Sequence, residues 1–380
     1  MARLDVAVVG AGPVGAAVAA LCAAPGLAIA VFEARPAPSK EARILALSHA
    51  SRALLEEIGA WPASQATPIA SIHISQKGGP GRTLLDAAEQ GLPALGYTVS
   101  YAALEEALAR RLGEAGVPIH YGESCDRIAL EREAARIHFA SGREVEAGLL
   151  VLADGGANAG KIPGIAFAEK DYEQHAVIGK VTTDRPHGAR AYERFTPQGP
   201  VALLPVEERY AFVFTASPAE AKRLLAAGDA QFLAELQSHF GDRAGRFTSV
   251  SGRASFPLRL RAVNVPVALR TAIVGNAAQA LHPIAGQGLN LGLRDAAALA
   301  SAIAAAAPGA IGGAAMLDAY RESRRRDATR GVAFTDFLAT VFADGRRLPT
   351  WGRGLALAAL DLFPPARRAL AERMIHGAPE

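Results

Sequence analysis

Three glycines near the start of the chain constrain its fold more than any other feature. Gly10, Gly12 and Gly15 follow an apolar, β-branched run, Leu4–Val9, which predicts a buried parallel strand. A helical pattern that opens with Pro13 comes directly after them. In this setting Gly10 permits a tight turn, Gly12 lets a pyrophosphate approach the backbone, and Gly15 lets helix and strand pack closely. The sequence therefore predicts a dinucleotide-binding turn; the alternative is a glycine-rich turn in an ordinary α/β domain.

An acidic residue supports the dinucleotide interpretation. Glu33 ends the next apolar run, at roughly the 20-residue spacing of the acids that bind ribose in such folds. A carboxylate there can accept hydrogen bonds from ribose hydroxyls, and it would repel a 2′-phosphate. The glycines and this acid do not separate FAD from NAD.

A second glycine loop, far along the chain, favours FAD. A buried strand pattern leads into a loop with Pro283, Gly286 and Gly288, and an alanine-rich helix follows from Asn290. The two glycines flank Gln287 and let the backbone approach a ligand without interference from Cβ atoms. Amides at a helix N-terminus attract an electron-rich group. A single cofactor that touches both loops has to be long, with a phosphate end and a redox end, as FAD has.

Several further polar residues lie beside predicted strands. Asp154 follows the apolar run 149–152 and either bonds the cofactor or holds the adjacent loop. Asn276 ends the next strand and can bond a sugar or ribityl hydroxyl. Arg43 is an isolated cation that meets either a phosphate or flavin edge, or only solvent. For a lone histidine such as His282, a structural role is the more frequent one.

Composition excludes several classes of protein. The 380-residue chain is half hydrophobic and 20% charged, so we expect a folded protein with room for two domains. A net charge of +3 without blocks of like charge gives no sign of nucleic-acid binding. Cys22 and Cys125 have no metal-ligand spacing, and we expect no metal. Gly and Pro residues interrupt the uncharged stretch 6–32, which argues against a membrane span or signal peptide and for a cytoplasmic protein.

The order of the predicted elements indicates an α/β fold with two interleaved domains. We expect a Rossmann-like, glutathione-reductase-like FAD-binding domain built from three segments, 1–70, 100–160 and 269–330. Residues 71–99 and 161–268 lack βαβ spacing and predict an inserted antiparallel β-sheet domain that binds the substrate. Residues 331–380 are expected to form C-terminal helices.

Four segments together resemble the class A FAD-dependent aromatic hydroxylases, in the branch of ubiquinone biosynthesis. They are the first glycine turn with Glu33 and residues 41–48, 153–155 and 275–295, and the likeness extends over nearly the whole chain. Within that branch, residues 191–205 and 275–283 resemble the group of 2-polyprenyl-6-methoxyphenol hydroxylases. Most of the wider family has Gly-Asp at 275–276 and His at 279, whereas this chain has Asn276 and Gln279.

The resemblance implies a role for each candidate site residue. The implied cofactor residues are Gly10, Gly12, Pro13 and Gly15 at the FAD pyrophosphate, Glu33 at the adenosine ribose, Arg43 and Asp154 along the cofactor, Asn276 at the ribityl chain or pyrophosphate, and Gly286, Gln287, Gly288, Leu289 and Asn290 at the flavin edge. Pro283 and Pro205 would line the substrate pocket above the isoalloxazine. Residues 156–160 lack the serine and the basic residue usual in the family, so the resemblance assigns no nicotinamide contacts there.

The activity implied by the resemblance is aromatic hydroxylation. In the family, transiently bound NAD(P)H reduces tightly bound FAD, O₂ then gives a flavin C4a-hydroperoxide, and one oxygen atom passes to a phenol. The implied substrate is a polyprenyl phenol of ubiquinone biosynthesis, and contacts with other ubiquinone-biosynthesis proteins are expected. Two alternatives stay open. One is another flavoenzyme on the same scaffold, such as a reductase or halogenase, and the other is a non-catalytic flavin-binding subunit of a ubiquinone-biosynthesis complex.

The C-terminal segment has a pattern that suits a membrane-embedded substrate. Trp351, Leu355, Ala358 and Leu362 share one helical face, and several arginines lie beside it. This pattern is typical of a helix that lies in a membrane surface, so residues 346–380 are predicted to contact the inner membrane surface peripherally. The alternative is a helix that packs on the protein's own core or on another chain.

Overall fold

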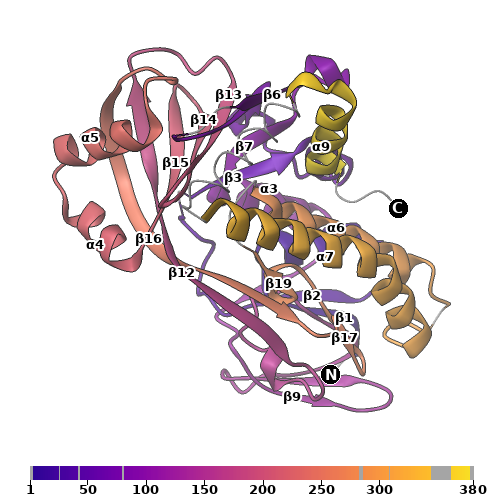
Figure 1. The fold of residues 1–380 in the computed structure, drawn as a ribbon. Helices are drawn as coiled ribbons and strands as arrows, with labels where there is room; N and C mark the ends of the chain where they lie inside the picture. Colours follow the sequence, from indigo (N-terminus) through magenta and orange to yellow (C-terminus); the bar gives the residue numbers. More distant parts are fainter. Residues whose placement is uncertain are drawn as a thin grey trace.

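The computed structural model describes residues 3–24, 26–41, 43–78, 81–281, 286–307, 309–343 and 361–376. Its first sheet carries the predicted parallel strands (Figure 1). They run in the order β18 (Thr271–Ile273), β11 (Glu144–Leu152), β1 (Leu4–Val9), β2 (Ile29–Glu33) and β8 (Ile119–Tyr121). Three antiparallel strands complete the sheet: β17 (Val267–Ala268), β9 (Cys125–Leu130) and β10 (Ala135–Phe139).

Helices cover one face of this sheet. They are α1 (Pro13–Leu21), α3 (Tyr101–Glu114), α6 (Gln287–Ala304) and α7 (Ala314–Ala343), and α6 and α7 lie side by side (Figure 1). Val6 and Val8 of β1 point into this layer, where they share one apolar core with Leu104, Leu293 and Leu317 of the helices. The burial of these side chains supplies the hydrophobic free energy that holds the glycine turn above β1 in place.

The opposite face of the first sheet is covered by the β9–β10 hairpin. Ala7 and Val9, which alternate with the residues above, pack there with Phe32 and Phe139. The rings of Phe32 and Phe139 stack with their centroids 4.7 Å apart. Burial on both faces explains why the sequence of β1 is continuously apolar.

The second sheet is antiparallel except where β5 pairs parallel with β13. Its order is β19 (Gln279–Ala280), β16 (Phe247–Val263), β12 (Phe167–Thr183), β15 (Arg209–Ala216), β14 (Gly199–Val206), β13 (Arg190–Thr196), β5 (Ser71–Gln76) and β6 (Arg82–Asp86). Helices α4 (Pro218–Ala226) and α5 (Asp229–Phe240) cover one face (Figure 1). Leu203, Phe212 and Phe214 pack against these helices, so the alternate residues of the same strands face the other way.

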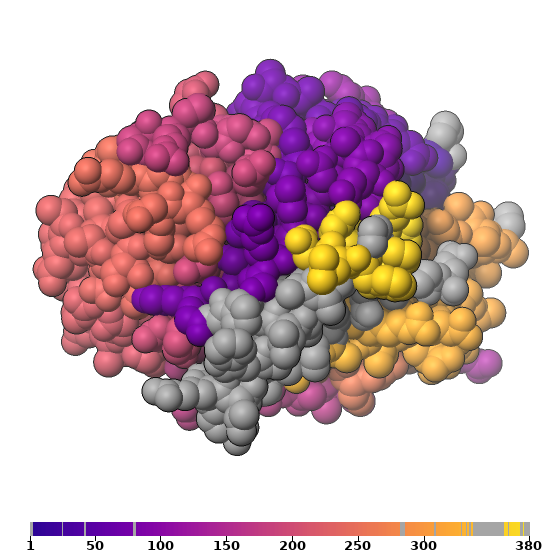
Figure 2. All heavy atoms as spheres, turned by 45° about the horizontal axis from the view of Figure 1, so that its top comes forward, coloured from indigo at the N-terminus to yellow at the C-terminus, as the bar shows by residue number. Residues whose placement is uncertain are grey.

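A small third sheet lies beside the C-terminal helix of the described structure. It contains β3 (Ile44–Ser48), β7 (Gly96–Ser100) and β4 (Thr67–Ile69), and α2 (His49–Glu57) follows β3 directly. Helix α9 (Pro364–His376) packs on α2, β3 and β6, so the yellow C-terminal helix lies against the purple N-terminal segments in Figure 2. Short 3-10 helices complete the fold: η1 (Ala63–Gln65), η2 (Ala88–Gln90), η3 (Ala159–Lys161) and η4 (Gly275–Ala277).

The predicted fold class is confirmed: a parallel α/β sheet with an inserted antiparallel sheet and C-terminal helices. The residue ranges of the two domains stay a prediction, to which the strand pairing adds one detail. Within 71–99, β5 and β6 belong to the antiparallel sheet, whereas β7 pairs with β3. In the described residues no helix has both the length and the apolar content needed to cross a membrane.

Candidate active site

The first glycine turn has the backbone geometry that requires glycine. Gly10 has φ +106°, and its N–H donates to the carbonyl of Phe32 at 2.8 Å. A Cβ atom on Gly10 would lie 2.6 Å from the carbonyl oxygen of Ala153. A Cβ atom on Gly15 would lie 2.1 Å from the carbonyl oxygen of Gly10. Both positions therefore exclude larger residues, because β1, β11 and α1 approach each other too closely.

Gly12 has a different reason for its small size. It is the N-cap of α1, in extended conformation, and Pro13 occupies the first helical position. No side chain caps this helix, and no acidic residue lies in its first turn. Gly12 and Pro13 line a large cavity, so the partial positive charge of the helix N-terminus faces that space. An anionic group such as a pyrophosphate fits there.

Glu33 is buried at the end of β2, close to the glycine turn. Its Oε2 accepts the N–H of Ala11 at 2.8 Å, and its Oε1 accepts the backbone N–H and Nε of Arg35, both at 3.0 Å. Arg35 also donates from Nη2 to Glu33 Oε2 at 3.1 Å and pairs with Glu105. Burial raises the pKa of Glu33, but the hydrogen bonds from Arg35 and Ala11 outweigh it and lower the pKa overall.

This arrangement qualifies the predicted ribose contact. A carboxylate has about four acceptor sites, and Glu33 already accepts four hydrogen bonds from the protein. A ribose hydroxyl would therefore have to share Glu33 with these donors or replace one of them. Arg35 was not predicted from the sequence, although a basic residue two positions after the acid is a visible signal.

The second glycine loop starts at η4. Gly275 has φ +60°, and a Cβ atom on it would lie 3.0 Å from Val14 of α1. A Cβ atom on Gly292 of α6 would lie 2.7 Å from Val14 as well. Helices α1 and α6 are thus held in direct contact, with the first turns of both helices at the same cavity. Asn276 is exposed toward Gly288, whose Cβ position lies 4.0 Å from the Asn276 Oδ1.

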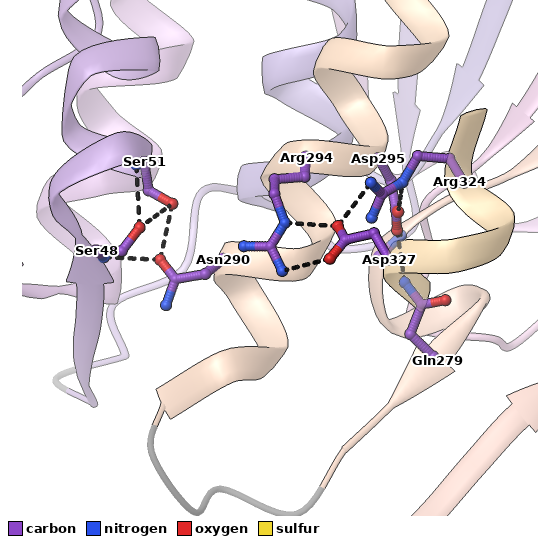
Figure 3. Close-up of polar contacts among 9 residues, drawn as sticks. Ser48, Ser51, Gln279, Asn290, Arg294, Asp295, Arg324 and Asp327 are labelled. Carbon is purple, nitrogen blue, oxygen red and sulfur yellow. Dashed lines mark hydrogen bonds and ion pairs between the residues drawn. The ribbon is translucent and has the colours of Figure 1, made fainter. Parts of the chain in front are cut away.

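A buried polar network holds residues 275–279, where this second loop begins (Figure 3). Asp295, only 1% exposed, accepts the N–H of Gly275 at 3.0 Å and the Nε2 of Gln279 at 2.6 Å. Its other oxygen pairs with Arg324 of α7 at 2.8 Å. Asp327 then joins Arg324 to Arg294, each at 2.7 Å. The network ties η4, α6 and α7 together, and it explains why Gln279 suits this loop. This network was not predicted from the sequence.

The side chain of Asn290 is bonded to the protein itself. Its Oδ1 accepts the N–H of Ser48 at 2.8 Å and the hydroxyl of Ser51 at 2.7 Å (Figure 3). Its Nδ2 donates to the carbonyls of Ala46 and Gly286, at 3.1 and 2.7 Å. All four hydrogen-bonding positions of the amide are used. The structure thus gives Asn290 a positioning role, in which it fixes Gly286 against β3.

Asp154 likewise holds its own loop. One oxygen accepts the N–H of Gly156 and the other accepts the backbone and side-chain N–H groups of Asn158, at 2.6 to 2.9 Å. Of the two roles predicted for Asp154, this arrangement matches the loop-holding one. Arg43 lines the cavity, where it pairs with Glu41 at 3.2 Å and lies over the ring of Tyr101 at 5.2 Å.

One cavity of about 880 Å³ joins both glycine loops. It is lined by Gly12, Pro13 and Arg43 near the first glycine turn, by Asn276, Gly286, Gly288 and Leu289 of the second loop, and by the free face of the second sheet. That face is largely apolar, with Ile72, Ile178, Leu204, Val213 and Phe256. The volume lies in the range of about 300 to 1,000 Å³ that small-molecule and cofactor sites occupy.

Two of the predicted site residues, Pro205 and Gln287, do not line this cavity. Pro205 is buried on the opposite face of β14, because Ala202 and Leu204 take the cavity face by strand alternation. Gln287 is buried in a small recess beside β3 and α9 instead. Pro283, like His282, lies outside the described residues. Among the residues that the structure describes, no cluster of side chains has the composition of a metal site.

These residues fit an elongated cofactor such as FAD. An uncapped helix N-terminus and a second, glycine-flanked helix N-terminus both face the cavity. A cavity that continues onto an apolar sheet face leaves space for a second, apolar molecule beside the cofactor.

Comparison with known proteins agrees with this geometry. The sequence matches a family model described as an FAD binding domain over residues 3–335. It is 34% identical to the ubiquinone hydroxylase UbiL of Rhodospirillum rubrum, over 96% of this chain and 87% of that protein. The chain belongs to the family of FAD-dependent hydroxylases. A second member, the 3-demethoxyubiquinol 3-hydroxylase of Escherichia coli, is 36% identical over 78% of each chain.

Solved structures share the fold of this family member. The p-nitrophenol 4-monooxygenase PnpA from Pseudomonas putida superposes with a TM-score of 0.80 at 18% identity, over 100% of this chain and 99% of that one. HpxO from Klebsiella pneumoniae, in complex with FAD and uric acid, gives a TM-score of 0.77 at 18% identity, over 98% and 97% of the two chains. At this identity the comparison establishes the fold.

Proposed function

We propose that this FAD-dependent monooxygenase hydroxylates the aromatic ring of a polyprenyl phenol in ubiquinone biosynthesis. The observation that carries the proposal is the single cavity, which runs from the uncapped N-terminus of α1 to the apolar face of the second sheet. The two relatives named above, a ubiquinone hydroxylase and a demethoxyubiquinol hydroxylase, support the substrate class.

The chain's own residues would divide the work along the cavity. The first turn of α1 and Arg43 would hold the phosphates of FAD, and the first turn of α6 would face the electron-rich edge of the flavin. When bound, FAD supplies the electron transfer and oxygen activation that side chains cannot supply. The apolar sheet face would orient the phenol and exclude water. NAD(P)H as transient donor and O₂ as co-substrate complete the proposal.

Oxygen isotope incorporation tests this function directly. The FAD-loaded protein, given NAD(P)H, ¹⁸O₂ and a 2-prenylated phenol, is expected to yield a hydroxylated phenol that carries one ¹⁸O atom, measured by mass spectrometry. Reduction of the flavin with all oxygen recovered as hydrogen peroxide would contradict the proposal. A flavin that no nicotinamide donor reduces, with or without the phenol, would indicate a non-catalytic subunit.

We further propose that residues 361–363, just before α9, contact a membrane surface, where a polyprenyl substrate resides. Leu362 is 82% exposed and Phe363 is 60% exposed, which is unusual for large apolar side chains. Leu370 of α9 lines the active-site cavity, so the helix that follows the exposed pair forms part of the cavity wall. Trp351, Leu355 and Ala358, which the sequence analysis placed on the same face, lie outside the described residues.

A double variant checks the membrane contact. Leu362→Asp with Phe363→Asp is expected to weaken binding to anionic liposomes about tenfold or more, because each apolar side chain contributes about 1.5–3 kcal/mol when buried. Flotation of the protein with liposomes measures this. Leu269→Asp is the matched control, since Leu269 is 51% exposed on the β17–β18 turn, away from α9. Equal flotation of the double variant and the wild type would contradict the proposal.

A further inference from the structure

Among the described residues, β13 contributes one carboxylate, Glu193, to the free face of the second sheet. Along β13 the side chains alternate, so that Ala191, Glu193 and Phe195 line the cavity. Arg194 points the other way, toward Ser75 and the carbonyl of His239. Glu193 therefore faces the space that the proposed substrate would occupy.

The residues beside Glu193 are apolar. Strand pairing places Ile74, Glu193, Ala202, Val213 and Ile178 in one straight row across β5, β13, β14, β15 and β12. All five line the cavity. The small side chain of Ala202 leaves open space beside the carboxylate.

Glu193 has no partner in the described protein. Burial is the one cause that shifts its pKa, which it raises to about 7, and no hydrogen bond or charge acts against it. Arg43, Glu169, Arg259 and Arg261 line the same cavity, but none of them perturbs Glu193. A carboxyl group without a partner in an apolar site is costly and is a frequent mark of function.

We propose that Glu193 accepts the hydrogen bond of the substrate's phenolic hydroxyl and takes its proton. This assignment rests on the proposed function and deepens it. The substrate class is then an amphiphile with one apolar chain and at least one ring hydroxyl, which lies over the row from Ile74 to Ile178.

The proton moves between the phenol oxygen and Glu193 only. The O–H bond of the phenol breaks and its electron pair stays on the phenol oxygen, while the proton bonds to a carboxylate oxygen of Glu193. The resulting phenolate is richer in electrons at the ring carbons ortho and para to its oxygen, where an electrophilic oxygen atom is accepted. The proton returns to the product oxygen before release, so no other reactant is needed. A group with a pKa near 7 suits transfer in both directions.

Paired ligands test the hydrogen bond without turnover. We would titrate 2-geranylphenol and its methyl ether, which lacks the donor, into the FAD-loaded protein without a nicotinamide donor, by calorimetry at pH 8. The wild type is expected to bind the phenol about tenfold or more tightly than the ether, as for a hydrogen bond to a charged group. Glu193→Leu is expected to abolish this preference and leave the affinity for the ether intact. Glu208→Gln, on the exposed β14–β15 turn, is the control and should match the wild type.

The pH dependence separates the charge from the hydrogen bond. In the wild type the preference for the phenol should increase from pH 6 to pH 8, as Glu193 ionises. Glu193→Gln keeps an acceptor but cannot ionise, so its preference should be smaller and independent of pH. A wild type without preference, or a Glu193→Leu variant that keeps it, would overturn the assignment.

Failure of this assignment and failure of the proposed function can be told apart. If the wild type prefers the phenol through Glu193 but forms no hydroxylated product, the proposed function is wrong and the assignment stands. If it hydroxylates the phenol with no effect of Glu193→Leu on binding or turnover, only the assignment is wrong.

The stability of the variants provides an independent readout. The folded protein raises the pKa of Glu193 from its ordinary value of 4.5 to about 7. Well below pH 4.5 the carboxyl is neutral in both folded and unfolded chains, so its ionisation has no effect on stability. As the pH rises toward 7 the unfolded chain ionises first, and the wild type should lose stability relative to Glu193→Leu. A difference in melting temperature that stays constant from pH 4.5 to 7 would show that Glu193 has a partner.

Discussion

Replacement of Asp295 by alanine is expected to lower the free energy of unfolding by about 3–5 kcal/mol, the usual cost of breaking a buried ion pair from one side. Asp295 is 1% exposed and Arg324 is 6% exposed, so the arginine would stay charged inside the protein with Asp327 as its remaining ionic partner. The N–H of Gly275 and the amide of Gln279 would lose their acceptor as well. Urea unfolding measured by circular dichroism gives the difference.

The same substitution should also loosen the part of the active site that carries Asn276. Gly275 and Gln279 flank the short helix that carries Asn276 into the cavity, and Asp295 holds both. Asp318→Ala is the matched control, because Asp318 forms an exposed ion pair with Arg321 on α7 and should contribute at most about 1 kcal/mol. If Asp295→Ala and Asp318→Ala lower stability equally, the network does not support the loop as described.

Replacement of Gly12 by valine is expected to reduce FAD affinity roughly 100-fold or more while the protein stays folded. Gly12 has φ −63° and ψ 171°, which valine adopts without strain, and a Cβ atom would meet only the hydroxyl of Tyr101, at 3.3 Å. The added side chain would occupy the space at the N-terminus of α1. A loss of about 3 kcal/mol, equivalent to one or two charge-assisted hydrogen bonds to a phosphate, corresponds to this factor.

Flavin content and fluorescence titration measure that loss. Gly113→Ala is the control, since Gly113 is exposed within α3 and a Cβ atom there meets nothing within 4 Å. It should keep full FAD affinity and gain up to about 1 kcal/mol of stability, because alanine is the better helix former. Normal flavin content in Gly12→Val would place the phosphates elsewhere.

The sequence predicted the features that depend on local spacing. The β-branched run before Gly10 predicted β1, and the three glycines predicted close approaches that the structure shows at Gly10 and Gly15. The change from βαβ spacing to alternating patterns predicted the second, antiparallel sheet. These patterns arise within a few residues of one another, so they are visible without a structure.

The features that depend on distant contacts could not be predicted in this way. Asp295 and Arg324 lie on different helices, and Asn290 bonds to Ser48 and Ser51, which are far away in the sequence. Nothing near Asn290 shows that its amide is used by the protein rather than by a ligand.

The face of a strand that a side chain occupies is a third feature that the sequence alone does not predict. Pro205 and Glu193 both lie in segments that the sequence analysis singled out, but only strand register decides which face each occupies. The register turns Pro205 away from the cavity and Glu193 into it.

A crystal structure of the FAD complex tests the central claim most directly, namely that one long cofactor spans both glycine loops. The account predicts one FAD molecule per chain, in contact with Gly12 at its pyrophosphate and with Gly288 at its flavin. Density that shows two separate molecules at these loops, or that leaves either loop without contact to FAD, would contradict it.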